Sequence, residues 1–141
     1  MSRPPCPTES QEGEVLVAWL RVHGIKFTHV PNETGHTQEA LRRAVRMKRQ
    51  GVSKGFPDYV VALPHVGMAY IELKRVYGSR TSPDQLEWVD VINSVPGSEA
   101  MVCAGADAAI AFVSRLLNGN IGQEQSTRPA SIGHTNDTLL F

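Results

Sequence analysis

The sequence lacks the features that mark several large classes of protein. Its 141 residues contain only two cysteines, Cys6 and Cys103, which lie far apart and have no paired-ligand spacing. A disulfide framework or a structural zinc site is therefore not expected. The N-terminal segment has no apolar stretch typical of a secretory signal, and no apolar run is long enough to cross a bilayer. These absences predict an intracellular, cytoplasmic protein.

The chain also has no excess of charge of either sign, because 14 lysines and arginines balance 14 aspartates and glutamates. The whole-chain charge therefore gives no argument for a polyanionic partner. The basic residues are nevertheless concentrated in one window that contains no acid, and its members are Arg42, Arg43, Arg46, Lys48, Arg49 and Lys54.

The hydrophobic periodicity predicts four helices and four strands. The helix starts are the clearest signals, because Thr8 with Gln11 and Ser82 with Gln85 both form capping-box patterns. The predicted helices cover roughly residues 9–23, 38–50, 83–93 and 107–118, and the predicted strands roughly 25–30, 58–63, 69–74 and 100–104. This order, α-β-α-β-β-α-β-α, predicts the α/β class, with a mixed sheet flanked by helices.

The expected folded domain covers residues 8–118. Residues 1–7 are proline-rich, and residues 119–141 are rich in polar residues and glycine, so disorder is expected at both ends. In the first helix, the residues expected to face the core are Val15, Leu16, Trp19 and Val22; in the third helix they are Leu86, Val89 and Val91 or Ile92.

Two carboxylates and a lysine form a candidate metal site. Side chains alternate along a strand, so Glu72 and Lys74 share one face of the strand 69–74, together with Tyr70. Asp58 opens the neighbouring strand, and the short link between the strands predicts an antiparallel hairpin. Such an oxygen-rich pocket suits Mg²⁺ or Mn²⁺, while Lys74 could orient a water or stabilise developing charge. The alternative is an ion pair on a solvated strand face.

The basic helix at 38–50 leads into the loop that precedes Asp58. The predicted nucleic-acid-binding residues are the members of the basic window, Arg42, Arg43, Arg46, Lys48, Arg49 and Lys54, which could bind phosphates beside the metal. The alternative is a solvated helix face, but such a face usually mixes charges of both signs.

Three segments carry a family resemblance. GVSKGFPD at 51–58, YIELK at 70–74 and SPDQLEW at 82–88 occur in the order and at the spacing of the VRR-NUC family, and the Pro31–Asn32 pair also fits the pattern. The sequence thus resembles these virus-type replication and repair nucleases, which belong to the PD-(D/E)xK superfamily. The resemblance covers roughly residues 9–117 and implies a restriction-endonuclease-like core.

The resemblance also implies roles for individual residues. Asp58 and Glu72 would bind the divalent metal together with the backbone carbonyl of Leu73, and Lys74 would be the catalytic lysine. Gln85 would order the site or a water. An acid of the first helix joins the site in this family; Glu12 fits best by the phase of the helix, and Glu9 and Glu14 are the alternatives.

The sequence therefore predicts a nuclease that hydrolyses DNA with Mg²⁺ or Mn²⁺. Branched or junction DNA is the expected substrate in replication, recombination or repair, and a homodimer, a phage origin and replication or repair partner proteins are further expectations from the resemblance. Two rivals remain: a module that binds nucleic acid without cutting it, and an enzyme of an unrelated type.

Overall fold

A computed structural model describes residues 4–32 and 35–127, with side chains up to Gly119. The elements, in chain order, are α1 (Glu9–Val22), β1 (Lys26–His29), α2 (Gln38–Arg49), β2 (Tyr59–Leu63), β3 (Gly67–Lys74), α3 (Pro83–Asn93), β4 (Ser98–Ala104) and α4 (Ala106–Thr127). The predicted α/β class and element order are confirmed.

The four strands form one mixed sheet in the order β1-β2-β3-β4. The pairs β1–β2 and β2–β3 are antiparallel, whereas β3 and β4 are parallel. The turn after Leu63 is short, so β2 and β3 form the predicted hairpin, while the parallel pair requires the longer crossover through α3. At the end of the hairpin, Gly67 comes so close to Gly97 that a Cβ atom would lie 2.2 Å from the Gly97 carbonyl oxygen.

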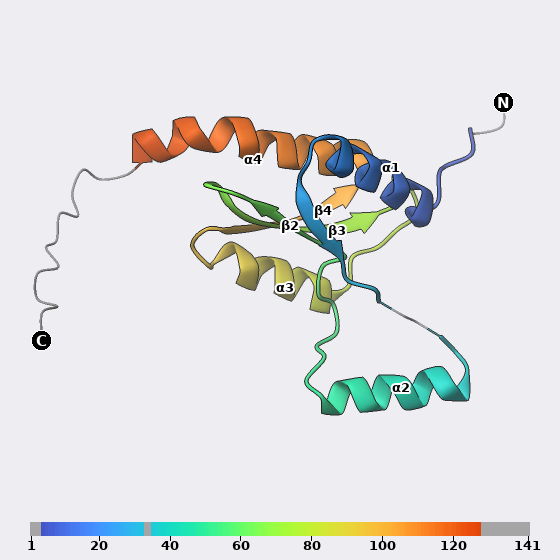
Figure 1. Cartoon of the computed structure of the whole chain (residues 1–141). Coiled ribbons are helices and arrows are strands. Elements are labelled where there is room, and N and C mark those ends of the chain that lie inside the picture. The colour runs from blue at the N-terminus through green and yellow to red at the C-terminus, as the bar shows by residue number, and fades with distance from the viewer. Residues whose placement is uncertain (1–3, 33–34, 128–141) are drawn as a thin grey trace, which may run out of the picture.

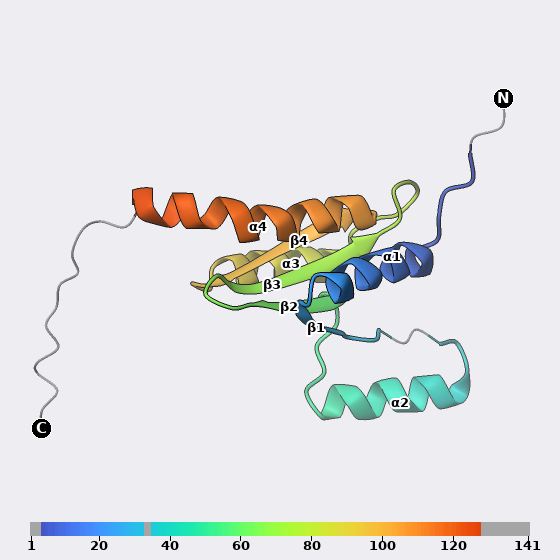
Figure 2. The same cartoon turned by 45° about the horizontal axis from the view of Figure 1, so that its top comes forward.

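Helices cover the two faces of the sheet unequally. Figures 1 and 2 show α1 and α4 over one face and α3 over the other. The main core lies on the α1–α4 face, where Ile71 and Leu73 of β3 join Leu16, Leu20 and Val113 in one buried cluster. Because side chains alternate along β3, its polar residues face α3 instead. The sequence prediction of two chemically different faces on this strand is thus confirmed.

The inward face of two helices differs from the prediction. In α1 the fully buried residues are Leu16 and Leu20, whereas Val15 is 52% and Val22 is 82% exposed. In α3, Leu86 is 50% exposed. The predictions for Val15, Val22 and Leu86 were therefore wrong, because the residues that become buried depend on how each helix packs against the sheet and its neighbours.

The last helix is longer than predicted. It begins at Ala106, so the predicted cap residue Asp107 lies in its first turn, and it extends to Thr127 rather than ending near Asn118. The helix thus occupies the start of the segment expected to be a disordered tail. The rest of that tail, residues 128–141, and residues 1–3 lie outside the described residues. None of the described helices, α4 included, is both long and apolar enough to span a membrane.

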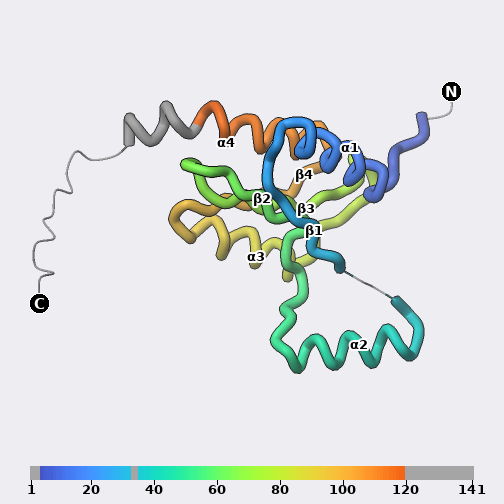
Figure 3. Tube along the Cα trace, in the orientation of Figure 1, coloured from blue at the N-terminus to red at the C-terminus, as the bar shows by residue number. Residues whose placement is uncertain are grey.

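Helix α2 stands apart from the sheet and its covering helices (Figures 1 and 3). It has no buried residue, and even its apolar residues Leu41 and Val45 are more than half exposed. Its predicted extent, 38–50, is confirmed to within one residue. The basic residues of this helix are therefore presented on an element that contributes little to the core.

Candidate active site

Asp58 and Glu72 face each other across the β2–β3 pair. Tyr59 is paired with Ile71, so Asp58 and Glu72 stand at the next step of the register, where β2 begins. They are the two buried charged side chains among the described residues, with 9% and 2% exposed. Burying two carboxylates side by side is unfavourable without compensating partners. The sequence prediction that these residues come together is thus met by the geometry.

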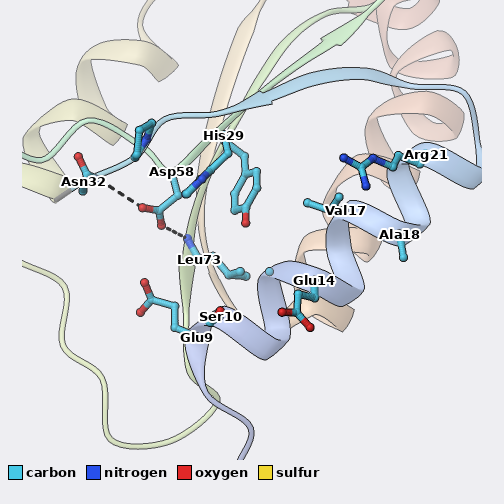
Figure 4. A pocket seen from close by; sticks show the side chains of 13 residues that line it. Glu9, Ser10, Glu14, Val17, Ala18, Arg21, His29, Asn32, Asp58 and Leu73 are labelled. Carbon is cyan, nitrogen blue, oxygen red and sulfur yellow. Dashed lines mark hydrogen bonds between the residues drawn. The ribbon is translucent and has the colours of Figure 1, made fainter.

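Backbone and amide donors fix the orientation of Asp58. Its Oδ2 accepts a hydrogen bond from the Leu73 backbone N–H at 2.9 Å, and its Oδ1 accepts one from Asn32 Nδ2 at 3.3 Å (Figure 4). In an extended strand the N–H and C=O of one residue point to the same side, so the Leu73 carbonyl also faces the side of Asp58. Asn32 belongs to the Pro31–Asn32 pair of the family pattern, but its contact with Asp58 was not predicted from the sequence.

Glu72 is only partly satisfied by its neighbours. Its Oε1 accepts a hydrogen bond from Gln85 Nε2 at 2.5 Å and lies 3.2 Å from Lys74 Nζ. Its Oε2 is buried and has no hydrogen-bond partner among the described residues. Burial, followed by the charge of Asp58, raises the pKa of Glu72 to about 7, although Lys74 acts in the opposite direction. A cation at this place would relieve both the repulsion and the unsatisfied oxygen.

Gln85 connects the start of α3 to the site. Its Oε1 accepts a hydrogen bond from the Ser82 backbone N–H at 2.9 Å, and its own N–H donates to Ser82 Oγ at 3.2 Å, which completes the predicted capping box. The same side chain then has Nε2 free to donate to Glu72. The preceding loop packs closely here, because a Cβ on Gly55, whose φ is +89°, would lie 2.7 Å from the Asp84 backbone.

The acidic residues of α1 lie in different environments. Glu12, the preferred candidate from the sequence, accepts a hydrogen bond from the Ala106 backbone N–H through Oε2 at 2.6 Å, so it caps α4. It is not among the residues that line the pocket beside Asp58, whereas Glu9 and Glu14 are. Figure 4 shows Glu9 and Asp58 near the same end of that pocket and Glu14 farther along α1. The structure therefore brings Glu9, rather than Glu12, to the site.

The pocket has a volume of about 650 Å³ and lies between α1 and the strands β1 and β2. Within the described residues, no three His, Cys, Asp or Glu side chains are close enough to form a complete protein cage for a metal. The paired Asp58 and Glu72 carboxylates, with Glu9 nearby, nevertheless supply oxygen ligands. Such a donor set fits a hard divalent cation that keeps several waters as ligands.

The predicted DNA-binding residues are all solvent-exposed. Lys54 has a side chain that is 86% exposed, lies 3.9 Å from Asp84, and accepts a hydrogen bond on its backbone carbonyl from Trp88 Nε1. This places Lys54 beside the first turn of α3, which carries Gln85. The remaining members stand on the separate helix α2 and are Arg42, Arg43, Arg46, Lys48 and Arg49.

Comparisons with known proteins identify the family and support the fold. The sequence model of the VRR-NUC domain family matches residues 8–107. A solved structure of a VRR_NUC domain protein is 23% identical, covers 81% of this chain and 91% of its own, and has a TM-score of 0.65. A second, of a VRR_NUC domain, is 16% identical, covers 77% and 97%, and has a TM-score of 0.54. None of the curated proteins matches.

The solved structures bear on the fold, which is consistent with the expected restriction-endonuclease-like core. The family match spans most of the chain and includes Asp58, Glu72, Lys74 and Gln85, the residues that meet in the site. The cluster of buried carboxylates thus lies within the region that matches the family model. The chain belongs to the VRR-NUC family, whose domain has a nuclease-type fold.

Proposed function

We propose that this protein is a divalent-metal-dependent nuclease that hydrolyses phosphodiester bonds of DNA. The observation that carries the proposal is the pair of buried carboxylates on neighbouring strands, one of which has an oxygen, Glu72 Oε2, without any partner among the described residues. An oxygen-ligated cation would compensate this arrangement, and the membership in a nuclease family supports the same reading.

Mg²⁺ or Mn²⁺ would be held by Asp58, Glu72 and the Leu73 carbonyl, and Glu9, rather than Glu12, would be the acid of α1 that lies beside the metal. When bound, the metal supplies a water of lowered pKa and neutralises charge on the phosphoryl oxygens. Asp58 is already oriented by the Leu73 N–H, and Glu72 by Gln85. The protein thus holds its ligands in place before the substrate arrives, which reduces the reorganisation needed during the reaction.

Lys74 is the residue assigned to the reacting phosphate and water. Its ammonium lies 3.2 Å from Glu72 Oε1, and its side chain is 15% exposed, so it stands at the boundary between the buried carboxylates and solvent. There it can orient the attacking water or stabilise the charge that develops on the phosphate. Gln85 is a positioning residue, because it acts on Glu72.

The proposed substrate is duplex or branched DNA, approached by the exposed basic residues of α2 and by Lys54. Their side chains are exposed to solvent, and phosphate contacts supply much of the affinity of such proteins. A homodimer, partner proteins in replication or repair, a phage origin and an intracellular location are parts of the same proposal.

The test is cleavage of labelled linear, flapped and four-way-junction DNA with Mn²⁺ or Mg²⁺. Wild-type protein is expected to cut in the presence of metal, and Asp58→Asn is expected to stop cutting because it removes a charged ligand. Asp107→Asn, an exposed acid in the first turn of α4, is the matched control and is expected to cut normally. Binding of DNA without any cutting by the folded wild type would instead favour the non-catalytic binding module.

A further inference from the structure

The pocket beside Asp58 extends along α1, away from the proposed metal site. Its wall on α1 is formed by residues four apart, from Glu9 through Gly13 and Val17 to Arg21, which share one face of the helix. The opposite wall includes His29 of β1. Figure 4 shows Glu9 near Asp58 at one end and Arg21 at the other. We call this feature the α1 groove.

The two ends of the α1 groove differ in charge. Glu9 and Asp58 make one end acidic, whereas the guanidinium group of Arg21 is exposed and has no hydrogen bond or ion pair among the described residues. Arg21 lies in the last turn of α1, where the negative end of the helix dipole favours a basic residue. That reason does not explain why the arginine lines the same pocket as the carboxylates.

The middle of the α1 groove offers apolar and aromatic surface. Val17 and Ala18 line it from α1, and the exposed ring of His29 packs against the buried ring of Tyr59 with their centroids 4.8 Å apart. The buried Tyr59 ring therefore packs against the inner side of the His29 ring. A fixed ring beside small apolar side chains is a suitable surface for a sugar or a base.

The dimensions of the α1 groove suit a short piece of a nucleic-acid strand. Its volume of about 650 Å³ lies within the range of roughly 300–1,000 Å³ that is usual for ligand pockets. Glu9 and Arg21 are separated by about 18 Å along the helix, from the rise of ~1.5 Å per residue. A B-form strand carries one phosphate per ~3.4 Å, so Arg21 would meet a phosphate no more than about five positions from the metal.

We propose that the α1 groove binds the DNA strand on one side of the cleaved bond. Arg21 pairs with a backbone phosphate a few nucleotides from the metal, and the His29 ring contacts the intervening sugar or base. Glu14 lies in the same wall and repels phosphates, so the strand is held chiefly at its two ends. This inference rests on the proposed function, because the groove leads away from the acids assigned to catalysis.

A phosphate scan tests the proposal. Labelled oligonucleotides of the preferred substrate are made with a single neutral methylphosphonate at each position near the cleavage site, and binding is measured with Ca²⁺ in place of Mn²⁺. Wild-type protein is expected to lose roughly tenfold in affinity at one or two adjacent positions, the size of one charge-assisted contact. Arg21→Gln is expected to bind roughly tenfold more weakly to the unmodified strand and to be insensitive at those same positions.

Two further variants act as controls. Lys26→Gln removes a positive charge from an exposed residue of β1 that does not line the groove, so it is expected to keep the wild-type scan. Glu14→Gln removes the repulsive charge and is expected to bind more tightly than wild type. A scan of Arg21→Gln that equals the wild-type scan, with normal cleavage in Mn²⁺, overturns the groove while the nuclease stands. If wild type neither cuts nor binds DNA, the proposed function and this inference both fall.

Discussion

The buried carboxylate of Glu72 should make the metal-free protein less stable as the pH rises. The pKa of Glu72 is about 7 in the folded protein against an ordinary value of 4.5. As the pH rises, the unfolded chain therefore loses this proton at a lower pH than the folded protein does. The group therefore costs nothing well below pH 4.5, and its cost grows until the pH passes about 7. Since one pKa unit corresponds to about 1.4 kcal/mol, the full cost is about 3 kcal/mol, of which roughly 2.5 kcal/mol appears between pH 5 and pH 8.

Glu72→Gln removes the ionisation and keeps an amide oxygen that can accept the hydrogen bond from Gln85. We expect the stability advantage of the variant over wild type to be roughly 2.5 kcal/mol larger at pH 8 than at pH 5, where Glu72 of the folded protein is still protonated. The measurement is urea unfolding of both proteins in EDTA at the two pH values. Titrating groups far from Glu72 affect both proteins alike and cancel in the difference.

A difference between the two proteins that is the same at pH 5 and pH 8 would refute the reasoning about Glu72. Adding Mn²⁺ at pH 8 gives an independent check, because a ligand that binds only the folded state stabilises it. Wild type is expected to gain stability from the metal and Glu72→Gln to gain much less. Equal gains would show that the metal is bound elsewhere.

Three other changes test separate parts of the account. Gly13→Ala places a Cβ 2.6 Å from the Tyr59 hydroxyl but no closer than 3.8 Å to any other atom outside its own helix, so it should lower the melting temperature in wild type. In a Tyr59→Phe background it should be neutral or stabilising, because alanine favours a helix more than glycine does; equal losses in both would contradict this packing. Gln85→Glu preserves the capping box but places a second carboxylate next to Glu72. The stability of the protein at pH 5 should therefore change little, while the cleavage rate falls by roughly tenfold or more; unchanged cleavage would exclude the positioning role. Replacing Arg42, Arg43 and Arg46 of α2 by alanine should make the slope of log affinity against log salt concentration shallower by about three, as measured by DNA titration across a salt series. An unchanged slope would show that α2 is an ordinary solvated helix.

Local signals in the sequence were reliable predictors. Both capping boxes were predicted correctly, because they involve side chains three residues apart and their own backbone. The alternation along β3 separated Glu72 and Lys74 from Ile71 and Leu73, since strand periodicity needs no knowledge of the rest of the fold. The hairpin then placed Asp58 opposite Glu72. The centre of the site was thus predictable from neighbouring residues.

What the sequence could not predict concerns contacts between distant parts of the chain. Glu12 and Glu9 both lie in the first turns of α1, and nothing local indicates that Glu12 caps a helix that starts at Ala106. Likewise, the rotation of α1 that buries Leu20 and exposes Val22 depends on the packing of the folded chain. Helical periodicity gives the width of an apolar stripe, but only the packing partners decide which residues at its margins are covered.

The most direct test of the nuclease is single-turnover cleavage of labelled DNA by wild type and Lys74→Met at pH 8 with Mn²⁺. Methionine keeps an apolar stem in the place of the lysine side chain and removes its charge, so the fold should persist, as circular dichroism would verify. The account predicts metal-dependent cutting by wild type that stops in EDTA, and a loss of roughly 100-fold or more in the variant, the size expected for one catalytic donor. Cutting by Lys74→Met at the wild-type rate, or cutting by wild type that persists in EDTA, would contradict it.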